Sequence, residues 1–86
     1  MIWDDVGFIV KSEKRKNLLL LLEKPRTPTQ LSKAMRSSLA NVSLKLKDLS
    51  DKGIIKCVNP ESKKGRIYML TENGKKTLEK IKEMES

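Results

Sequence analysis

The stretch of residues 27–55, TPTQLSKAMRSSLANVSLKLKDLSDKGII, predicts two helices joined by a short turn. Thr27 suits the N-cap of the first helix, and Pro28 suits its first position, where the missing N–H costs nothing. Gln30 can close a capping box onto the Thr27 amide. We expect this helix to end near Met35. The residues expected to face inward are Leu31, Ala34 and Met35.

The second helix of the pair is expected over residues 38–52, after a turn at residues 36–38. Ser38 suits the N-cap, and Gly53 suits the left-handed position that commonly follows a helix. Apolar residues recur at spacings of three and four, which is typical of an amphipathic helix with one buried face. The members of this stripe are Leu39, Val42, Leu46 and Leu49.

Two further helices are predicted before this pair. A short one covers residues 5–11, and a longer one begins after an N-cap at Ser12 and runs to Lys24, before Pro25. Five consecutive leucines, residues 18–22, cover every face of the longer helix, so we expect other helices to surround it. A strand is the competing interpretation, but leucine is unbranched at Cβ and its charged neighbours are good helix formers.

The pattern changes after Gly53. Residues 54–58 and 66–70 predict two short strands, and the polar, turn-rich segment between them predicts a long basic loop, so we expect an antiparallel hairpin. Thr71 suits the cap of a final helix to about Met84, in which Gly74 is a minor flaw. The apolar side of that helix is predicted to carry Leu78, Ile81 and Met84. Cys57, in the first strand, is expected to be a small core residue rather than a redox-sensing thiol.

The composition limits the classes of function. The chain has 86 residues, so we expect residues 1–86 to form a single domain, and only three residues are aromatic. It contains no histidine and one cysteine, which excludes a histidine-based catalytic triad, a histidine-containing zinc site and an intramolecular disulfide. We therefore expect no enzyme, no metal and no cofactor. The absence of a long apolar run argues against a membrane span, and a cytoplasmic location is expected.

The formal net charge of +8 is concentrated in the middle of the chain. Residues 1–10 carry −2 and residues 72–86 carry no net charge, so the whole excess lies in residues 11–71. A disordered basic tail would give the opposite distribution. The positive field therefore belongs to the folded body and indicates a polyanionic partner, most commonly nucleic acid.

The order of helices, turn and hairpin resembles the winged helix-turn-helix transcriptional regulators of the broad MarR/ArsR-like group, especially small archaeal-type members. The similarity is carried by residues 27–34, 38–43, 46–55 and 60–71, and it extends over about residues 8–80. It implies a mainly α fold with a small β-hairpin (α+β): a three-helix core, a basic wing and a C-terminal helix. It also implies double-stranded DNA as the partner, with helix 38–52 in the major groove and wing 59–66 on phosphates or in the minor groove.

The helical phase of residues 38–52 identifies candidate base contacts. If Val42, Leu46 and Leu49 face the core, then at about 100° per residue another face points outward. Asn41 can pair with adenine, and Leu44 can contact a thymine methyl group. Related regulators often carry a basic or polar residue at this leucine. The base contacts expected are Ser38, Ala40, Asn41, Ser43 and Leu44, against the alternative of an ordinary solvated face.

Candidate backbone contacts are the basic and polar residues that flank the two helices and occupy the loop. They are Thr29, Lys33, Arg36, Lys47, Lys63, Lys64 and Arg66, with Arg26 as a further candidate. The alternative for Lys63, Lys64 and Arg66 is an ordinary soluble loop, which is what a run of charged residues usually forms. Residues 14–16, a basic run at a helix start, oppose the helix dipole, which is compatible with a bound anion.

Apolar residues near both termini exceed what a small monomer needs. We expect a homodimer with Trp3, Phe8, Ile9, Leu78 and Ile81 at the interface, against the alternative that they pack within one chain. A different function also remains open, that of a winged-helix protein-interaction module in a transcription or replication assembly. Single-stranded nucleic acid is disfavoured because the chain lacks an aromatic stacking platform.

Overall fold

The computed structural model describes residues 2–85, which form five helices and a two-stranded hairpin. The elements in chain order are α1 (Ile2–Val10), α2 (Glu13–Leu21), α3 (Pro28–Met35), α4 (Leu39–Asp51), β1 (Ile55–Cys57), β2 (Tyr68–Leu70) and α5 (Glu72–Glu85). The strands are antiparallel, with Ile55 opposite Leu70 and Cys57 opposite Tyr68. This is the mainly helical fold with a small hairpin that the sequence predicts.

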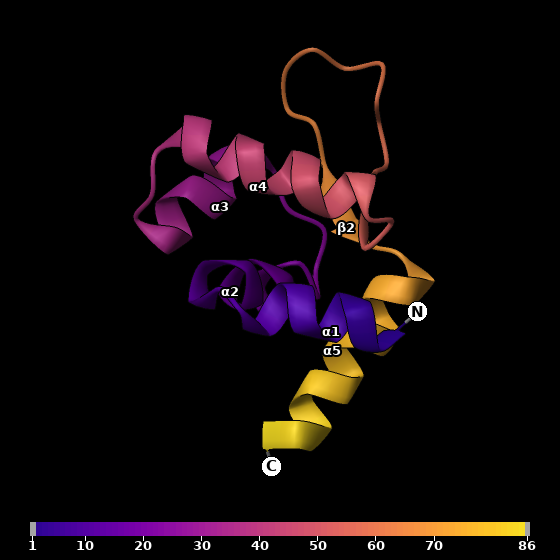
Figure 1. Cartoon of the computed structure of the whole chain (residues 1–86). Helices are drawn as coiled ribbons and strands as arrows, with labels where there is room; N and C mark the ends of the chain where they lie inside the picture. Colours follow the sequence, from indigo (N-terminus) through magenta and orange to yellow (C-terminus); the bar gives the residue numbers. More distant parts are fainter. Residues whose placement is uncertain (1, 86) are drawn as a thin grey trace.

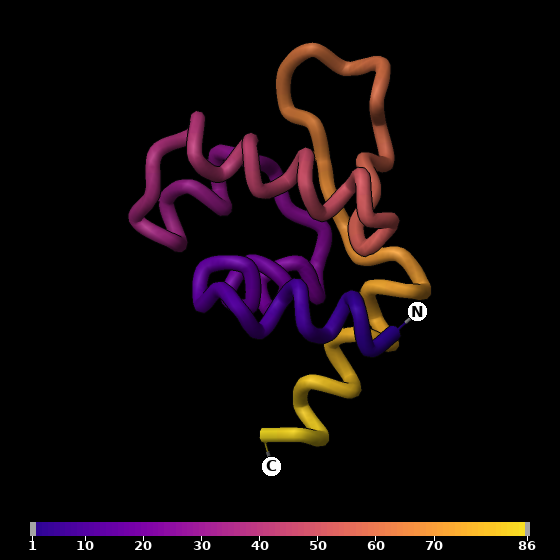
Figure 2. The backbone as a smooth tube through the Cα atoms, viewed as in Figure 1, coloured from indigo at the N-terminus to yellow at the C-terminus, as the bar shows by residue number. Residues whose placement is uncertain are grey.

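The other helices pack on two sides of the α1–α2 pair (Figure 1). Helices α3 and α4 pack together on one side of the α1–α2 pair, and α5 crosses α1 on the other side (Figure 1). The loop between β1 and β2 projects beyond α4, whereas the C-terminal end of α5 lies at the opposite end of the molecule (Figure 2). The wing and α4 therefore share one end of the molecule, and the C-terminal end of α5 lies at the other (Figure 2).

One aliphatic core joins all seven elements. Its fourteen buried residues are Val6, Ile9, Leu18, Leu19, Leu22, Leu31, Val42, Leu46, Leu49, Ile54, Ile55, Leu70, Leu78 and Ile81. Phe8 and Tyr68 pack against its edge and are only partly buried. The core thus relies on leucine, isoleucine and valine packing, as the near absence of aromatic residues requires.

The predicted helix caps are confirmed. The Thr27 hydroxyl accepts from the Gln30 amide (3.2 Å), and the Gln30 side chain accepts from the Thr27 amide (3.0 Å), which completes the capping box. Ser12 and Ser38 cap α2 and α4 through their hydroxyl groups. Gly53 has a φ of 73°, the left-handed conformation expected after α4.

Several boundaries and orientations differ from the sequence-based expectations. Helix α2 ends at Leu21 rather than Lys24. The chain tightens there, because the Leu22 amide also donates to the Leu19 carbonyl oxygen (3.1 Å) and the Glu23 amide donates to the Leu20 carbonyl oxygen (3.3 Å). Leu20 is exposed, so the leucine run is not surrounded on every side. The stripe predictions are wrong for residues near helix ends, where the chain turns away from the core. These exposed residues are Ala34, Leu39 and Met84.

The segment between α2 and α3 pairs with β2 of the hairpin through an isolated antiparallel β-bridge. The Arg26 amide donates to the Tyr68 carbonyl oxygen (3.0 Å), and the Tyr68 amide donates to the Arg26 carbonyl oxygen (2.8 Å). No pattern in the sequence predicts this bridge. The bridge attaches the segment just before α3 to β2, so it fixes the position of the α3–α4 pair relative to the hairpin.

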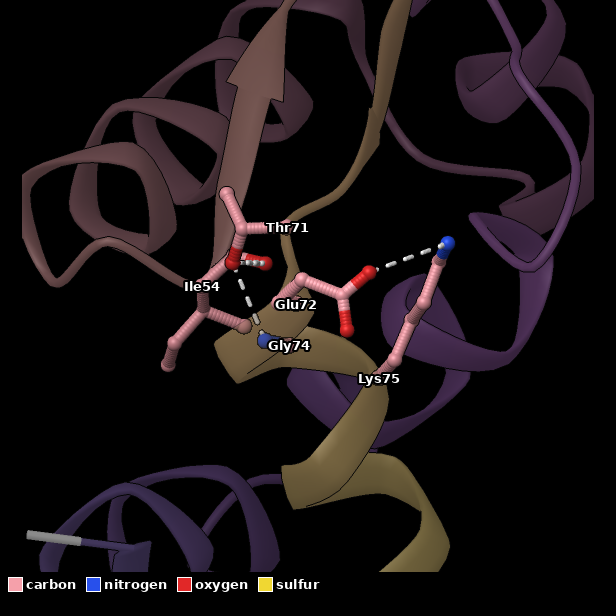
Figure 3. A network of polar contacts seen from close by, with 5 residues as sticks. All are labelled: Ile54, Thr71, Glu72, Gly74 and Lys75. Carbon is pink, nitrogen blue, oxygen red and sulfur yellow. Dashed lines mark hydrogen bonds and ion pairs between the residues drawn. The ribbon is translucent and has the colours of Figure 1, made fainter.

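Helix α5 begins in close contact with the start of the hairpin (Figure 3). The Thr71 hydroxyl accepts from the Gly74 amide (3.0 Å) and lies 3.1 Å from the Ile54 carbonyl oxygen. The Thr71 amide also donates to that carbonyl group (3.0 Å). Thr71 is therefore the predicted cap of α5, and it also ties the helix to the residue that precedes β1.

The terminal helices pack on each other within one chain, which corrects part of the predicted dimer interface. The side chains of Ile9, Leu78 and Ile81 are almost fully buried in the core, so they are not available to a second copy. Asp5 in α1 accepts from the Asn73 amide group in α5 (2.8 Å), which fastens the two helices. The expectation of intermolecular contact was wrong for these three because a core of this size needs both termini to close.

Two of the three side chains in the basic run of residues 14–16 have partners within the chain. The Arg15 guanidinium lies over the Phe8 ring (3.9 Å to its centroid) and donates to the Phe8 carbonyl oxygen. Lys16 pairs with Glu85, and this hydrogen bond raises the pKa of Lys16 above its ordinary value. Intramolecular partners therefore explain these two charges without a bound anion. None of the helices within residues 2–85 has the length and apolar character that crossing a membrane requires.

Candidate nucleic-acid interface

The turn between α3 and α4 is held by specific backbone and side-chain contacts. Arg36 ends α3 in a left-handed conformation with a φ of 53°, which is uncommon for a residue other than glycine. The Ser37 amide donates to the Ser32 carbonyl oxygen (3.1 Å), and the Ser32 hydroxyl donates to the Ser37 carbonyl oxygen (2.6 Å). These bonds fix the angle at which α4 leaves the turn, and with it the direction of its outer face.

The outer face of α4 consists of exposed small or polar residues and one large aliphatic side chain. All five predicted base contacts are exposed: Ser38, Ala40, Asn41, Ser43 and Leu44. Leu44 is 64% exposed. The Ser38 hydroxyl accepts from the Asn41 amide (3.1 Å), so its oxygen is already used for capping, whereas its proton is still available to a partner. The Asn41 side chain makes no hydrogen bond within residues 2–85.

The wing presents three cations from a loop with defined turns. Lys63, Lys64 and Arg66 are exposed, as predicted, and Gly65 between them has a φ of 67°. The Arg66 Nε atom donates to the Ser62 carbonyl oxygen (2.8 Å), which holds the guanidinium close to the loop. The positive charges therefore lie on a structured hairpin beside α4.

A groove separates the wing from the helix pair. Its volume is about 460 Å³, and its lining residues are Thr27, Pro28, Thr29, Leu39, Ser43, Lys63, Lys64, Gly65 and Arg66. It continues along α4 as a second hollow of about 520 Å³, which reaches Lys47 and Asp51. The first part is lined by three cations and no carboxylate. The Asp51 carboxylate in the second part is paired with Lys47 (3.2 Å), so the groove as a whole favours an anion.

The groove brings together some of the predicted backbone contacts and leaves others apart. Thr29, Lys47 and the three wing cations line it. Lys33 and Arg36 are exposed at the far end of α3 and do not line it. Arg26 is half-buried, and its Nε atom donates to the Leu21 carbonyl oxygen, so its side chain supports the chain rather than the groove.

Sequence reasoning missed Thr27, Pro28 and Leu39 as groove residues. Leu39 lies three residues before Val42, so its spacing placed it in the buried stripe, whereas its position in the first turn of α4 leaves it exposed. Thr27 and Pro28 were assigned only to helix capping, and nothing in the sequence shows that the start of α3 faces the wing. Cys57 is partly buried rather than fully in the core.

The comparisons with known proteins agree with this architecture. A family model described as winged helix-turn-helix matches residues 6–86. A solved MarR-family transcription regulator is 28% identical, with a TM-score of 0.69 over 84% of this chain and 49% of the other. The adhesin competence repressor AdcR from Streptococcus pyogenes is 22% identical, with a TM-score of 0.71 over 86% of this chain and 57% of the other, which shows the fold alone.

A third solved structure contains nucleic acid. The transcriptional repressor CouR, bound to a 23-mer DNA duplex, is 25% identical, with a TM-score of 0.77 over 95% of this chain and 63% of the other. The present chain thus spans from about half to somewhat under two thirds of these structures. No curated protein matches the sequence significantly. Because the family model covers nearly all of its residues, the chain belongs to the winged helix-turn-helix family, and its fold is similar to that of MarR-family transcription regulators.

Proposed function

We propose that this protein is a transcription regulator that binds double-stranded DNA sequence-specifically, with α4 in the major groove and the wing on the adjacent backbone or minor groove. The observation that carries the proposal is the groove between α4 and the wing, lined by three cations and no carboxylate. Its walls are a helix with an exposed polar face and a basic loop, the two parts with which a winged helix holds a duplex.

The outer face of α4 suits direct reading of base edges. Its first half carries small side chains at Ser38, Ala40 and Ser43, which permit close approach to the floor of the major groove. Asn41 has the donor and acceptor needed to pair with adenine, and the exposed Leu44 offers an apolar contact to a thymine methyl group. We infer that these five residues provide sequence preference.

The basic residues around the groove suit contacts with phosphates, which add affinity without sequence information. Lys63 and Lys64 act as flexible point charges, and Arg66 has the planar group that fits a narrow minor groove. Thr29 and Lys47 lie on the helix side of the same groove, so one backbone strand can be held from both walls. CouR, whose solved structure contains a DNA duplex, supports this mode of binding through its similar fold.

The function is tested by fluorescence anisotropy titration of duplex DNA at two salt concentrations, followed by selection of bound duplexes from a random pool. Binding that weakens steeply with salt supports phosphate contacts, and a recovered consensus supports base reading. Absence of binding at low salt, despite a net charge of +8, would contradict the proposal. It would instead favour the alternative, a winged-helix module that assembles with other proteins.

We also propose a homodimer, with an interface revised by the burial of the terminal residues. Trp3 is 57% exposed and Met84 is 54% exposed. The Lys80 ammonium group lies 5.4 Å from the centroid of the Trp3 ring, and Met84 follows Lys80 by one turn of α5. Phe8 is already held between Arg15 and Lys52. A two-fold axis near Trp3 and Met84 would pair the least basic parts of the chain and leave both α4 helices free for DNA.

A further inference from the structure

The wing keeps its shape without a hydrophobic core of its own. Between Val58 and Ile67 the loop contributes no residue to the fourteen-residue core, and the cations at its tip are exposed. Loops of this length without packed side chains are ordinarily flexible. The geometry therefore requires another source of order, and the hydrogen bonds of the loop supply it.

Four of these hydrogen bonds involve the side chain of one residue, Asn59. Its Oδ1 atom accepts from the Ile67 amide (2.7 Å) and from the Cys57 thiol (3.5 Å). Its Nδ2 atom donates to the Gly65 carbonyl oxygen (3.2 Å) and to the Ser62 hydroxyl (3.4 Å). Asn59 is thus bonded to both arms of the loop and to its tip.

The bond to Ile67 continues the hairpin ladder beyond the strands. The Val58 amide donates to the Ile67 carbonyl oxygen (2.8 Å), and the Asn59 side chain then provides the acceptor for the Ile67 amide. The Asn59 carbonyl oxygen also accepts from the Ser62 amide (3.0 Å), which closes a turn at the start of the loop. A single amide side chain therefore replaces the cross-strand pairing that the loop lacks.

The two loop residues to which Asn59 Nδ2 donates, Ser62 and Gly65, adjoin the three wing cations in sequence. The Ser62 carbonyl oxygen accepts a hydrogen bond from the Arg66 Nε atom (2.8 Å). Gly65, between Lys64 and Arg66, has a left-handed conformation. We propose that Asn59 is a positioning residue for DNA binding, which presents Lys63, Lys64 and Arg66 to the duplex without touching it. This inference rests on the proposed function, because it assigns the wing cations to DNA.

The test compares Asn59→Ala with Asn17→Ala, which removes the same group from an exposed position on α2. Asn59→Ala is expected to weaken duplex binding about tenfold, because a loop that has lost these hydrogen bonds must be ordered when the duplex binds. It is also expected to speed amide exchange at Ile67 while the melting temperature stays close to that of the wild type. Asn17→Ala should change none of these.

A double-mutant cycle separates positioning from a general loss of structure. In a background with Lys63, Lys64 and Arg66 all replaced by alanine, Asn59→Ala should cost less than about twofold, because the cations that it positions are gone. The same tenfold loss in both backgrounds would overturn the proposal. Gly65→Ala perturbs the loop from its other arm, and a Cβ there has open space, so it should reproduce the loss through backbone strain alone.

The two proposals fail in different ways. A wild-type chain that does not bind duplex DNA at low salt overturns the proposed function and this inference together. A wild-type chain that binds, with Asn59→Ala binding equally well, overturns only the inference about Asn59. Unchanged exchange at the Ile67 amide in Asn59→Ala would also overturn it, because the side chain would then not hold the loop.

Discussion

Gly74 and Ile54 approach each other so closely that any side chain at position 74 would overlap the Ile54 carbonyl group unless the backbone moved. A Cβ atom on Gly74 would lie 2.0 Å from the Ile54 carbonyl oxygen and 3.1 Å from its carbonyl carbon. The sequence alone suggested only a weak point in the first turn of α5, because glycine is a poor helix former. The structure shows that this glycine permits α5 to start directly against the residue before β1 (Figure 3).

Gly74→Ala is therefore expected to lower the free energy of unfolding. The contact is with backbone, so α5 or the hairpin must move, and a strain of about 3 kcal/mol, the upper end of the usual overpacking cost, outweighs the gain of about 1 kcal/mol in helix propensity. Gly7→Ala in α1 is the matched control, since a Cβ there meets nothing within 4 Å and should stabilise the protein by about 0.5–1 kcal/mol. Urea denaturation of both variants measures the difference, and equal stability of the two would contradict this role for Gly74.

The contrast at position 74 illustrates what the sequence can and cannot predict. Local rules predicted the order of the elements, because capping residues such as Thr27 and Thr71 act within three or four residues of themselves. The close approach of Gly74 to Ile54 joins residues twenty apart, and the bridge between Arg26 and Tyr68 joins residues still further apart. Such contacts are set by tertiary packing, which leaves no periodic pattern in the sequence.

The candidate site could also be predicted only where local helical geometry determines it. The exposed face of α4 follows from helical phase, and it was predicted correctly for Asn41 and Leu44. Leu39 was misplaced because apolar spacing does not reveal where a helix leaves the core. The role of Asn59 was invisible, since its hydrogen bonds reach across the loop to Gly65 and Ile67 and depend on the folded shape of the wing.

The base contact assigned to Asn41 predicts a loss of discrimination rather than of affinity in general. Asn41→Ala should reduce the preference for the best base at one position of the selected site by about 1–3 kcal/mol and leave non-specific binding nearly unchanged. Competition titrations with single-position variants of the duplex measure this preference. An equal loss of affinity for all duplexes would instead indicate that Asn41 contacts the DNA backbone. Asn17→Ala provides the control.

The wing lysines predict the opposite behaviour. Replacing Lys63 and Lys64 together with alanine should weaken binding to all duplexes and lower the slope of log affinity against log salt by up to about two units. The control is Lys75→Ala with Lys76→Ala, which removes the same charge from α5, away from the groove. An unchanged salt slope in the wing variant would remove these lysines from the phosphate contacts.

The oligomeric state depends on whether the exposed apolar side chains of the terminal helices meet a second copy. Trp3 in α1 lies beside Lys80 of α5, and Met84 follows Lys80 by one helical turn, so we expect the two exposed side chains to contribute to one interface. Wild-type protein at micromolar concentration should sediment as a dimer, at twice 9.8 kDa. Trp3→Ala with Met84→Ala should shift it towards the monomer, because each side chain loses apolar area that the interface would bury. The control, Leu20→Ala with Val58→Ala, removes exposed apolar groups elsewhere and should leave the dimer intact. A wild-type species of 9.8 kDa at equilibrium would contradict the dimer and leave Trp3 and Met84 as ordinary surface residues.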